Sequence, residues 1–147
     1  MFKHILLPHD GSALSGKAVK RGIDFAGKIN ARVTAIHVVP QFMVAADVSL
    51  VPLSPALRKR LEEQAHLRAQ KMLGTIARQA KTRGLRCATM SVASDFPYQQ
   101  IITAARKKKC DLIMMASHGR RGLSSLLLGS ETAKVLMHSK VPVLVVR

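Results

Sequence analysis

The sequence predicts a single α/β domain built around a parallel β-sheet with helices on both faces. Segments rich in Val, Ile and Leu alternate along the chain with segments of helical periodicity. The length of 147 residues suits one domain, and an aromatic content of only 3% requires an aliphatic core. We find no internal repeat or linker, so one domain is expected to span residues 1–147.

The first half of the chain is predicted to fold as strand, helix, strand and helix. Ile5 to Leu7 is a continuous apolar run, and Asp10-Gly11-Ser12 then forms a turn. Apolar residues next recur at helical spacing, whereas the Pro-containing segment 40–55 is expected to be a loop. The predicted elements are a strand over 3–8, a helix over 12–28, a strand over 31–39 and a long amphipathic helix over 57–83.

The second half continues the alternation and ends in a strand. The predicted elements are a strand over 85–93, a helix over 97–108, a strand over 111–116, a helix over 130–139 and a strand over 141–146. This order implies parallel strands joined by right-handed crossovers. The connection over 117–129 is long compared with the usual βα loop of about 2–6 residues, which indicates a function for it.

Charge and composition limit the compartment and the partners. The formal net charge is +16, which should attract nucleotides, nucleic acids or acidic membrane surfaces. The N-terminal apolar run is too short for a signal peptide or a membrane span, so a cytoplasmic protein is expected. Only Cys87 and Cys110 occur, without the spacing of a zinc site or a disulfide framework, and both are expected to be incidental thiols.

A ligand crevice is expected where the turns after the first and fourth strands meet, beyond the carboxyl ends of the sheet. Gly119 and Gly129 permit close backbone approach, and Gly129-Ser130 begins the last helix. Free amides and the helix dipole at that point favour phosphate oxygens. A simpler interpretation is also open, in which the glycines only turn the chain and Ser130 caps a helix. Likewise, Asp10 can stabilise its own turn, bind a ligand, or do both.

Three motifs give the chain a family resemblance. The first strand ends in Pro8-His9-Asp10-Gly11-Ser12, and the second ends in His37-Val38. Near the C-terminus, Ala116 and Gly119 are followed by nine residues and then by Gly129-Ser130. In these features the whole chain resembles the universal stress protein family, whose nucleotide-binding members have the pattern Gly-x2-Gly-x9-Gly-Ser/Thr. The spacing is kept, but Ala116 stands in place of the first glycine.

The resemblance implies a doubly wound five-stranded sheet of order 3-2-1-4-5 and a homodimeric, ATP-binding stress-response or regulatory protein. ATP, with or without magnesium, would lie with its ribose near Asp10, adenine near the Val38 backbone, and phosphates near Gly119, Gly129 and Ser130. The methyl group of Ala116 could weaken ATP binding or alter the preferred ligand, but the departure is interpreted as modest because the backbone N–H is retained. The implied nucleotide-binding residues are Pro8, Asp10, Val38, Met115, Ala116, His118, Gly119, Arg120, Arg121, Gly129 and Ser130.

The closing strand is expected to be a sheet edge, which pairing of residues 141–146 with a second copy would cover. Catalysis beyond slow, incidental ATP hydrolysis is not expected, because no Ser or Cys lies in a recognisable nucleophile motif. His37 and His118 are interpreted as packed or hydrogen-bonding residues.

Three alternatives remain open from the sequence. One is a scaffold of the same fold that holds no nucleotide, and another is an enzyme that uses ATP. The third is a nucleic-acid or polyanion binder that relies on the basic runs 58–60 and 106–109, although the scarcity of aromatic residues disfavours base stacking.

Overall fold

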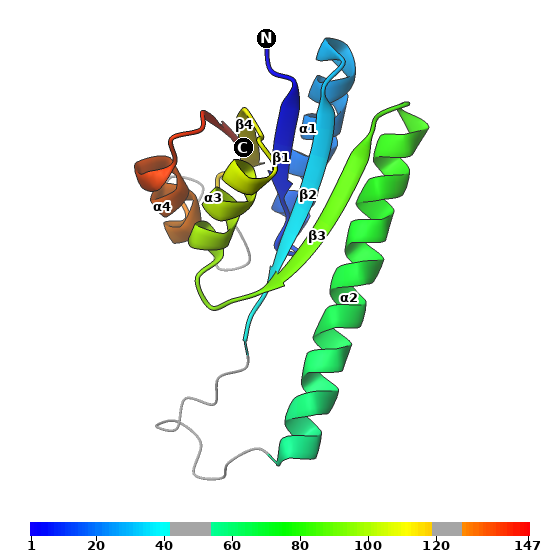
Figure 1. Ribbon diagram of the computed structural model, residues 1–147, viewed down its shortest axis with the longest axis vertical. Helices are drawn as coiled ribbons and strands as arrows, with labels where there is room; N and C mark the ends of the chain where they lie inside the picture. The colour runs from blue at the N-terminus through cyan, green and yellow to red at the C-terminus, as the bar shows by residue number, and fades with distance from the viewer. Residues whose placement is uncertain (42–53, 119–127) are drawn as a thin grey trace.

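The computed structural model describes residues 1–41, 54–118 and 128–147 of the chain (Figure 1). It contains one five-stranded parallel sheet in the order β3-β2-β1-β4-β5, as predicted. Its elements are β1 (His4–Pro8), α1 (Ala13–Ile29), β2 (Arg32–Val39), α2 (Pro55–Thr82), β3 (Cys87–Ala93), α3 (Pro97–Lys107), β4 (Leu112–Ala116), α4 (Ser130–His138) and β5 (Val143–Val146).

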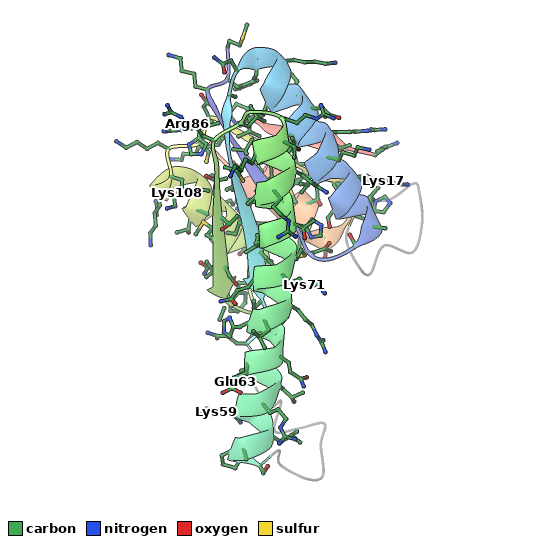
Figure 2. The ribbon with its side chains drawn as sticks, turned by 90° about the vertical axis from the view of Figure 1, so that its right-hand side faces the viewer. Lys17, Lys59, Glu63, Lys71, Arg86 and Lys108 are labelled. Atoms are coloured by element: carbon green, nitrogen blue, oxygen red, sulfur yellow. The ribbon has the colours of Figure 1, made fainter. Side chains whose placement is uncertain are left out.

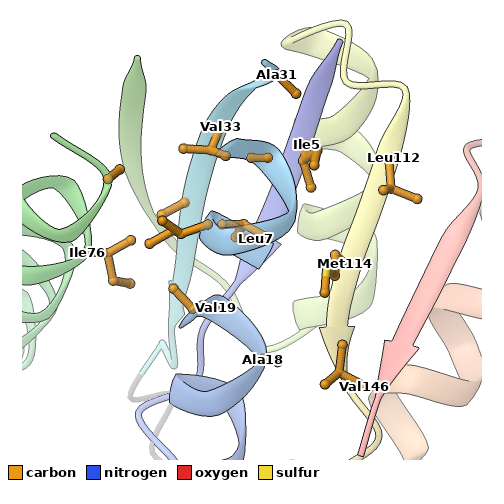
Figure 3. Packing of buried hydrophobic residues seen from close by; sticks show 14 of the residues in the cluster. Ile5, Leu7, Ala18, Val19, Ala31, Val33, Ile76, Leu112, Met114 and Val146 are labelled. Atoms are coloured by element: carbon orange, nitrogen blue, oxygen red, sulfur yellow. The ribbon is translucent and has the colours of Figure 1, made fainter. Parts of the chain in front are cut away.

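Helices cover both faces of the sheet, with α1 and α2 on one face and α3 and α4 on the other. Alternate strand residues therefore enter different cores: Ile5 and Leu7 of β1 face α1 and α2, whereas Leu6 faces α3. All three side chains are fully buried. Figure 3 shows the first core, where Leu7 lies beside Val19 of α1 and Ile76 of α2 contributes from the next helix. The near-continuous apolar runs in the sequence thus reflect strands that are buried on both faces.

Small differences from the predicted boundaries have local causes. The last strand begins at Val143, two residues later than predicted, because Pro142 has no amide to donate to the sheet. Helix α2 begins earlier than predicted, at Pro55, because the Ser54 hydroxyl accepts a hydrogen bond from the Leu57 amide at 3.2 Å.

Helix α2 is packed along only part of its 28 residues. Its buried side chains all lie in the second half, at Ala69, Leu73, Ile76 and Ala80. The first half extends beyond the sheet and carries exposed charged side chains (Figures 1 and 2). In the described parts of the chain, no helix combines the length and apolar character needed to cross a membrane.

Both cysteines are free thiols of low reactivity. Cys110 is buried in the core, where desolvation, followed by the nearby Asp111 carboxylate, raises the pKa of its thiol to about 11. Cys87 is half-buried, and burial raises its thiol pKa as well. A thiol with a raised pKa forms little of the reactive thiolate at neutral pH.

Asp111 joins the beginnings of β4 and β1. Its Oδ2 accepts a hydrogen bond from the Lys3 amide at 2.8 Å, and its Oδ1 accepts one from the His4 amide at 2.9 Å. Burial alone would raise the pKa of the carboxyl, but the hydrogen bonds from His4, Lys3 and its own amide outweigh that effect and lower the pKa. The ionised form of Asp111 is therefore the form that stabilises the fold.

We expect Asp111→Ala to lower the free energy of unfolding at pH 7 by about 1.5–3 kcal/mol, since two amides lose a charged acceptor. Because folding lowers this pKa, the stabilisation is complete above the unfolded-state value and disappears as the pH falls through the folded-state value. Urea unfolding at pH 7 and pH 3 should therefore show the difference from wild type shrinking in acid. The exposed Asp95→Ala is the control, and a difference independent of pH would contradict the assignment.

Candidate functional site

The candidate site lies beyond the carboxyl ends of β1 and β4. These strands are neighbours, but the chain continues from β1 to β2 on one side and from β4 to β5 on the other. In doubly wound sheets, ligands bind in the crevice expected beyond two such neighbouring strands, and here the strand ends are Pro8 and Ala116. This is the place at which the sequence predicts that the two turns meet.

The turn after β1 is fixed by hydrogen bonds within it. The His9 amide donates to the Ile36 carbonyl at 2.9 Å, which anchors the end of the strand. Asp10 Oδ1 accepts the Ser12 amide at 2.9 Å, and the Ser12 hydroxyl caps α1 by accepting the Ser15 amide at 3.1 Å. Gly11 has φ 89°, a value that side chains disfavour. The structural role predicted for Asp10 is confirmed, and Ser12 is the N-cap of α1.

His37 supports the same turn from β2. Its ring is buried, and its Nδ1 lies 2.6 Å from the His9 carbonyl oxygen, so the ring is the donor in that hydrogen bond. The contact agrees with the expectation that His37 is a packed, hydrogen-bonding residue. It also connects the end of β2, which carries Val38, to the turn that carries Asp10.

The side of the candidate site opposite the β1 turn is formed where β4 ends and α4 begins. The Gly129 amide donates to the Ser117 carbonyl at 2.8 Å, and the Thr132 hydroxyl donates to the Ala116 carbonyl at 3.0 Å. A Cβ atom at position 129 would lie 3.0 Å from His118 Cα and 3.3 Å from the Ser117 carbonyl oxygen. Gly129 therefore permits the close backbone approach that the sequence predicts, although its own amide is already bonded within the chain.

Two buried polar atoms beside this junction lack hydrogen-bond partners among the described residues. They are Ser117 Oγ and His118 Nδ1, which follow β4 directly. Buried polar groups are nearly always satisfied, so such atoms next to a crevice indicate a place for a ligand or water. Ser117 was not among the predicted site residues. Its position between two predicted residues, Ala116 and His118, could have indicated that it belongs to the same site.

The other predicted site residues have different surroundings. Pro8 and Met115 are buried, and the Met115 side chain packs in the core beneath α3 and α4. The Ala116 methyl group packs in the opposite core, beneath α1 and α2. Half-buried Val38 packs at the margin of the core that contains Met115. Of the remaining predicted residues, Ser130 is the first residue of α4, whereas Gly119, Arg120 and Arg121 lie outside the described residues.

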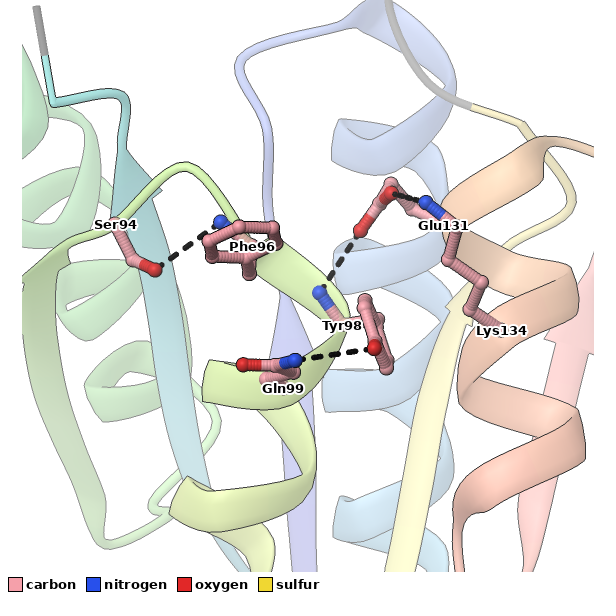
Figure 4. Close-up of polar contacts among 6 residues, drawn as sticks. All are labelled: Ser94, Phe96, Tyr98, Gln99, Glu131 and Lys134. Atoms are coloured by element: carbon pink, nitrogen blue, oxygen red, sulfur yellow. Dashed lines mark hydrogen bonds and ion pairs between the residues drawn. The ribbon is translucent and has the colours of Figure 1, made fainter. Parts of the chain in front are cut away.

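A polar network sets the orientation of α4 relative to α3 (Figure 4). Glu131 accepts the Tyr98 amide at 2.8 Å, so it caps the start of α3 in the absence of a side-chain cap from Phe96. The same carboxylate pairs with Lys134 at 2.8 Å, and the Lys134 ammonium lies 5.4 Å from the centre of the Tyr98 ring. This contact could not be predicted from the sequence, because its partners are 33 residues apart.

The arrangement suits an anionic ligand. The first amides of a helix have no acceptors within the helix, and the positive end of its dipole lies there. Helix α4 presents this end beside the carboxyl end of β4, where hydrogen bonds from Gly129 and Thr132 hold it in place.

A groove of about 290 Å³ adjoins the turn at His9, between α1 and α2, and is lined by His9, Gly16, Val19, Met72, Thr75, Ile76 and Gln79. The described residues contain no cluster of His, Cys, Asp and Glu that could hold a metal ion.

Comparison with known proteins gives one consistent family. The model of the universal stress protein family matches residues 1–147. A universal stress protein of Methanocaldococcus jannaschii is 33% identical to this chain over 150 residues. The match covers 100% of this chain and 83% of the archaeal protein. The solved structure of a second universal stress protein from that archaeon has a TM-score of 0.83 at 27% identity, with 99% and 96% of the two chains covered.

Two more distant structures with the same fold contain nucleotides. A universal stress protein in complex with cAMP has a TM-score of 0.72 at 21% identity, over 99% of this chain and 97% of its own. A family protein of Arabidopsis thaliana with AMP bound has a TM-score of 0.68 at 16% identity, over 98% and 90% of the two chains.

Proposed function

Because this chain belongs to the universal stress protein family, we propose that it is a stress-response protein that binds an adenine nucleotide, with ATP as the preferred ligand. The proposed site is the crevice between the ends of β1 and β4. Relatives of the same fold that hold cAMP and AMP support an adenine nucleotide as the ligand class.

The junction of β4 with α4 is the observation that carries this proposal. Gly129 brings the positive end of α4 against the end of β4, where phosphate oxygens would meet helix amides. Ser117 Oγ and His118 Nδ1 are buried there without partners among the described residues, so they are available to a ligand. The Ala116 methyl group packs in the core beneath α1 and α2, and we therefore expect it to cost little binding affinity.

We further propose binding without rapid turnover. Asp10 accepts the Ser12 amide, and Glu131 accepts the Tyr98 amide and pairs with Lys134. These carboxylates near the crevice already have structural partners, which makes them poorly suited to act as a general base. The bound nucleotide would instead act as a signal that changes how the protein contacts other molecules.

Mass spectrometry of the denatured protein, purified without added nucleotide, tests the proposal directly. We expect ATP or another adenine nucleotide to be released in a stoichiometric amount. Calorimetric titration of the emptied protein with ATP, AMP and cAMP, with and without magnesium, should then show one site per chain and rank the ligands. Absence of both a released nucleotide and a titration signal would leave the nucleotide-free scaffold as the function to pursue.

Two substitutions at Asp10 separate its structural role from a ligand role. Asp10→Asn keeps an oxygen that can accept the Ser12 amide, so the turn should persist, whereas Asp10→Ala removes that acceptor. If the carboxylate binds the ribose, both variants should weaken ATP binding by about tenfold or more, and only the alanine variant should also lower the melting temperature. Unchanged affinity in Asp10→Asn would limit Asp10 to a structural role.

A further inference from the structure

A shallow cavity, largely open to solvent, lies at the opposite end of the sheet from the proposed nucleotide site. Its volume is about 370 Å³, and it is lined by His4, Arg32, Val33, Thr34, Arg86, Cys87, Ala88 and Lys108. These residues come from the amino-terminal ends of β1, β2 and β3 and from the C-cap of α3. The volume falls within the usual range for small-molecule sites, about 300–1,000 Å³.

The lining of this cavity is strongly basic. Arg32, Arg86 and Lys108 are exposed at its edge, and none of its lining residues is acidic. Lys108 caps α3, where a cation is favoured by the helix dipole. That explanation does not apply to Arg32, which begins β2, or to Arg86, which precedes β3. Together the three cations give this end of the sheet a positive potential that attracts anions.

His4 forms the buried wall of the cavity. Its Nε2 lies 2.8 Å from the hydroxyl of buried Thr34, while its Nδ1 is buried without a hydrogen-bond partner among the described residues. Burial and then the charge of Arg32 lower the pKa of the ring, whereas the Lys108 and Lys109 carbonyls and Asp111 act in the opposite direction. The net effect is a lowered pKa, which favours the neutral ring, and an anion in the cavity would oppose this effect.

We propose that this cavity is a second ligand site, which binds the phosphate group of a small molecule through Arg32, Arg86 and Lys108, with His4 behind it. A guanidinium presents paired donors that match two phosphate oxygens, and the ammonium of Lys108 adds a point charge. Figure 2 shows Arg86 and Lys108 on the same side of the view, whereas Lys17 lies on the opposite side and Lys71 lies lower along α2. The free phosphate ion and a phosphate monoester share this recognition chemistry.

Titration of the full chain with inorganic phosphate at constant ionic strength, with saturating ATP present, tests the proposal. The ATP occupies the proposed nucleotide site, and the ring resonances of His4 report locally on the cavity. We expect saturable shifts of those resonances, with glycerol phosphate binding more tightly than phosphate if the cavity also accepts the attached organic group. If only phosphate binds, the site is one for the free ion.

The double variant Arg32→Gln with Arg86→Gln should weaken phosphate binding by at least tenfold while leaving ATP affinity unchanged. The matched control, Lys17→Gln with Lys71→Gln, removes the same charge from exposed positions on α1 and α2 and should keep phosphate binding within twofold. Equal weakening in both double variants would assign the binding to the overall charge of the molecule and overturn the proposal. Shifts that are absent or do not saturate would also overturn it.

A single-stranded DNA oligonucleotide distinguishes a nucleic-acid surface from a small-molecule site. We expect weak binding that falls steeply with salt and does not compete with phosphate for the cavity. Tight oligonucleotide binding that displaces phosphate and is lost in the arginine variant would overturn the assignment to a small molecule. Failure of ATP to bind, with phosphate binding retained, would overturn the proposed function but not this second site.

Discussion

Gly129→Val is expected to abolish measurable ATP binding, with a loss of affinity of at least about 100-fold. The valine Cβ would lie 3.0 Å from His118 Cα and 3.2 Å from His118 Cβ, so the backbone on one side must shift by a few tenths of an ångström, and the two valine methyl groups add to the crowding. The surroundings cannot yield easily, because the Ser117 amide donates to the Val146 carbonyl at 2.8 Å. The start of α4 must therefore move away from β4, and the helix amides leave the positions that we propose for the phosphates.

Calorimetric titration with ATP and thermal unfolding measure the two effects of this variant separately. The fold should survive with a loss of about 1–3 kcal/mol, the usual cost of overpacking. Gly129→Ala should show a smaller loss of affinity in the same direction. Gly27→Ala is the matched control, since a Cβ atom there meets nothing within 4 Å, and it should bind ATP like wild type. Wild-type affinity in Gly129→Val would exclude the α4 terminus from the site.

The double variant Met137→Glu with Leu144→Glu is expected to convert a homodimer into monomers. Strand β5 is an edge of the sheet, and apolar side chains are exposed on it and on the adjacent helix α4. Leu144 of β5 is 42% exposed to solvent, and Met137 of α4 is 78% exposed. The other edge strand, β3, instead exposes small or polar residues such as Ala88, Thr89 and Ser91. We therefore propose that two β5 strands pair across a twofold axis, which covers both the unpaired backbone and these side chains.

Light scattering after size-exclusion chromatography measures this effect. Wild type should have twice the chain mass of 16.0 kDa, and the variant should have the mass of one chain, because the buried carboxylates raise the dimer dissociation constant by at least about 100-fold. Leu67→Glu is the control, since Leu67 is 64% exposed on α2, and it should stay dimeric. A monomeric wild type would contradict the proposed pairing.

The fold was predictable from the sequence because each strand is short, aliphatic and bounded by a turn. Ile5, Leu6 and Leu7 form an uninterrupted apolar run, which is the pattern of a strand covered on both faces, and the structure places Leu6 in a different core from its neighbours. The strand order came from the family resemblance, since periodicity alone does not specify which strands are neighbours. The boundaries that shifted lie at Pro142 and Ser54, where local hydrogen bonding decides where an element begins.

The candidate site was predictable where its contacts are local. The Asp10-Ser12 turn and its cap lie within a few residues, and their types indicate their hydrogen bonds. The contact of His37 with the His9 carbonyl and that of Glu131 with the Tyr98 amide span 28 and 33 residues, so only the folded chain reveals them. The same reason explains why the basic cavity at His4 was not foreseen, since its arginines are far apart in sequence.

The uneven packing of α2 divides this helix into two regions of different local stability. The region from Ala69 to Ala80 can lose its hydrogen bonds only when its buried side chains leave the core, so its amides should exchange with solvent at rates close to those of global unfolding. The first turns, from Pro55 onward, bury no side chain and depend on the Ser54 cap and on helix propensity. They are therefore expected to open and close many times during one lifetime of the folded domain, so their amides should exchange with solvent much faster than those of the second half.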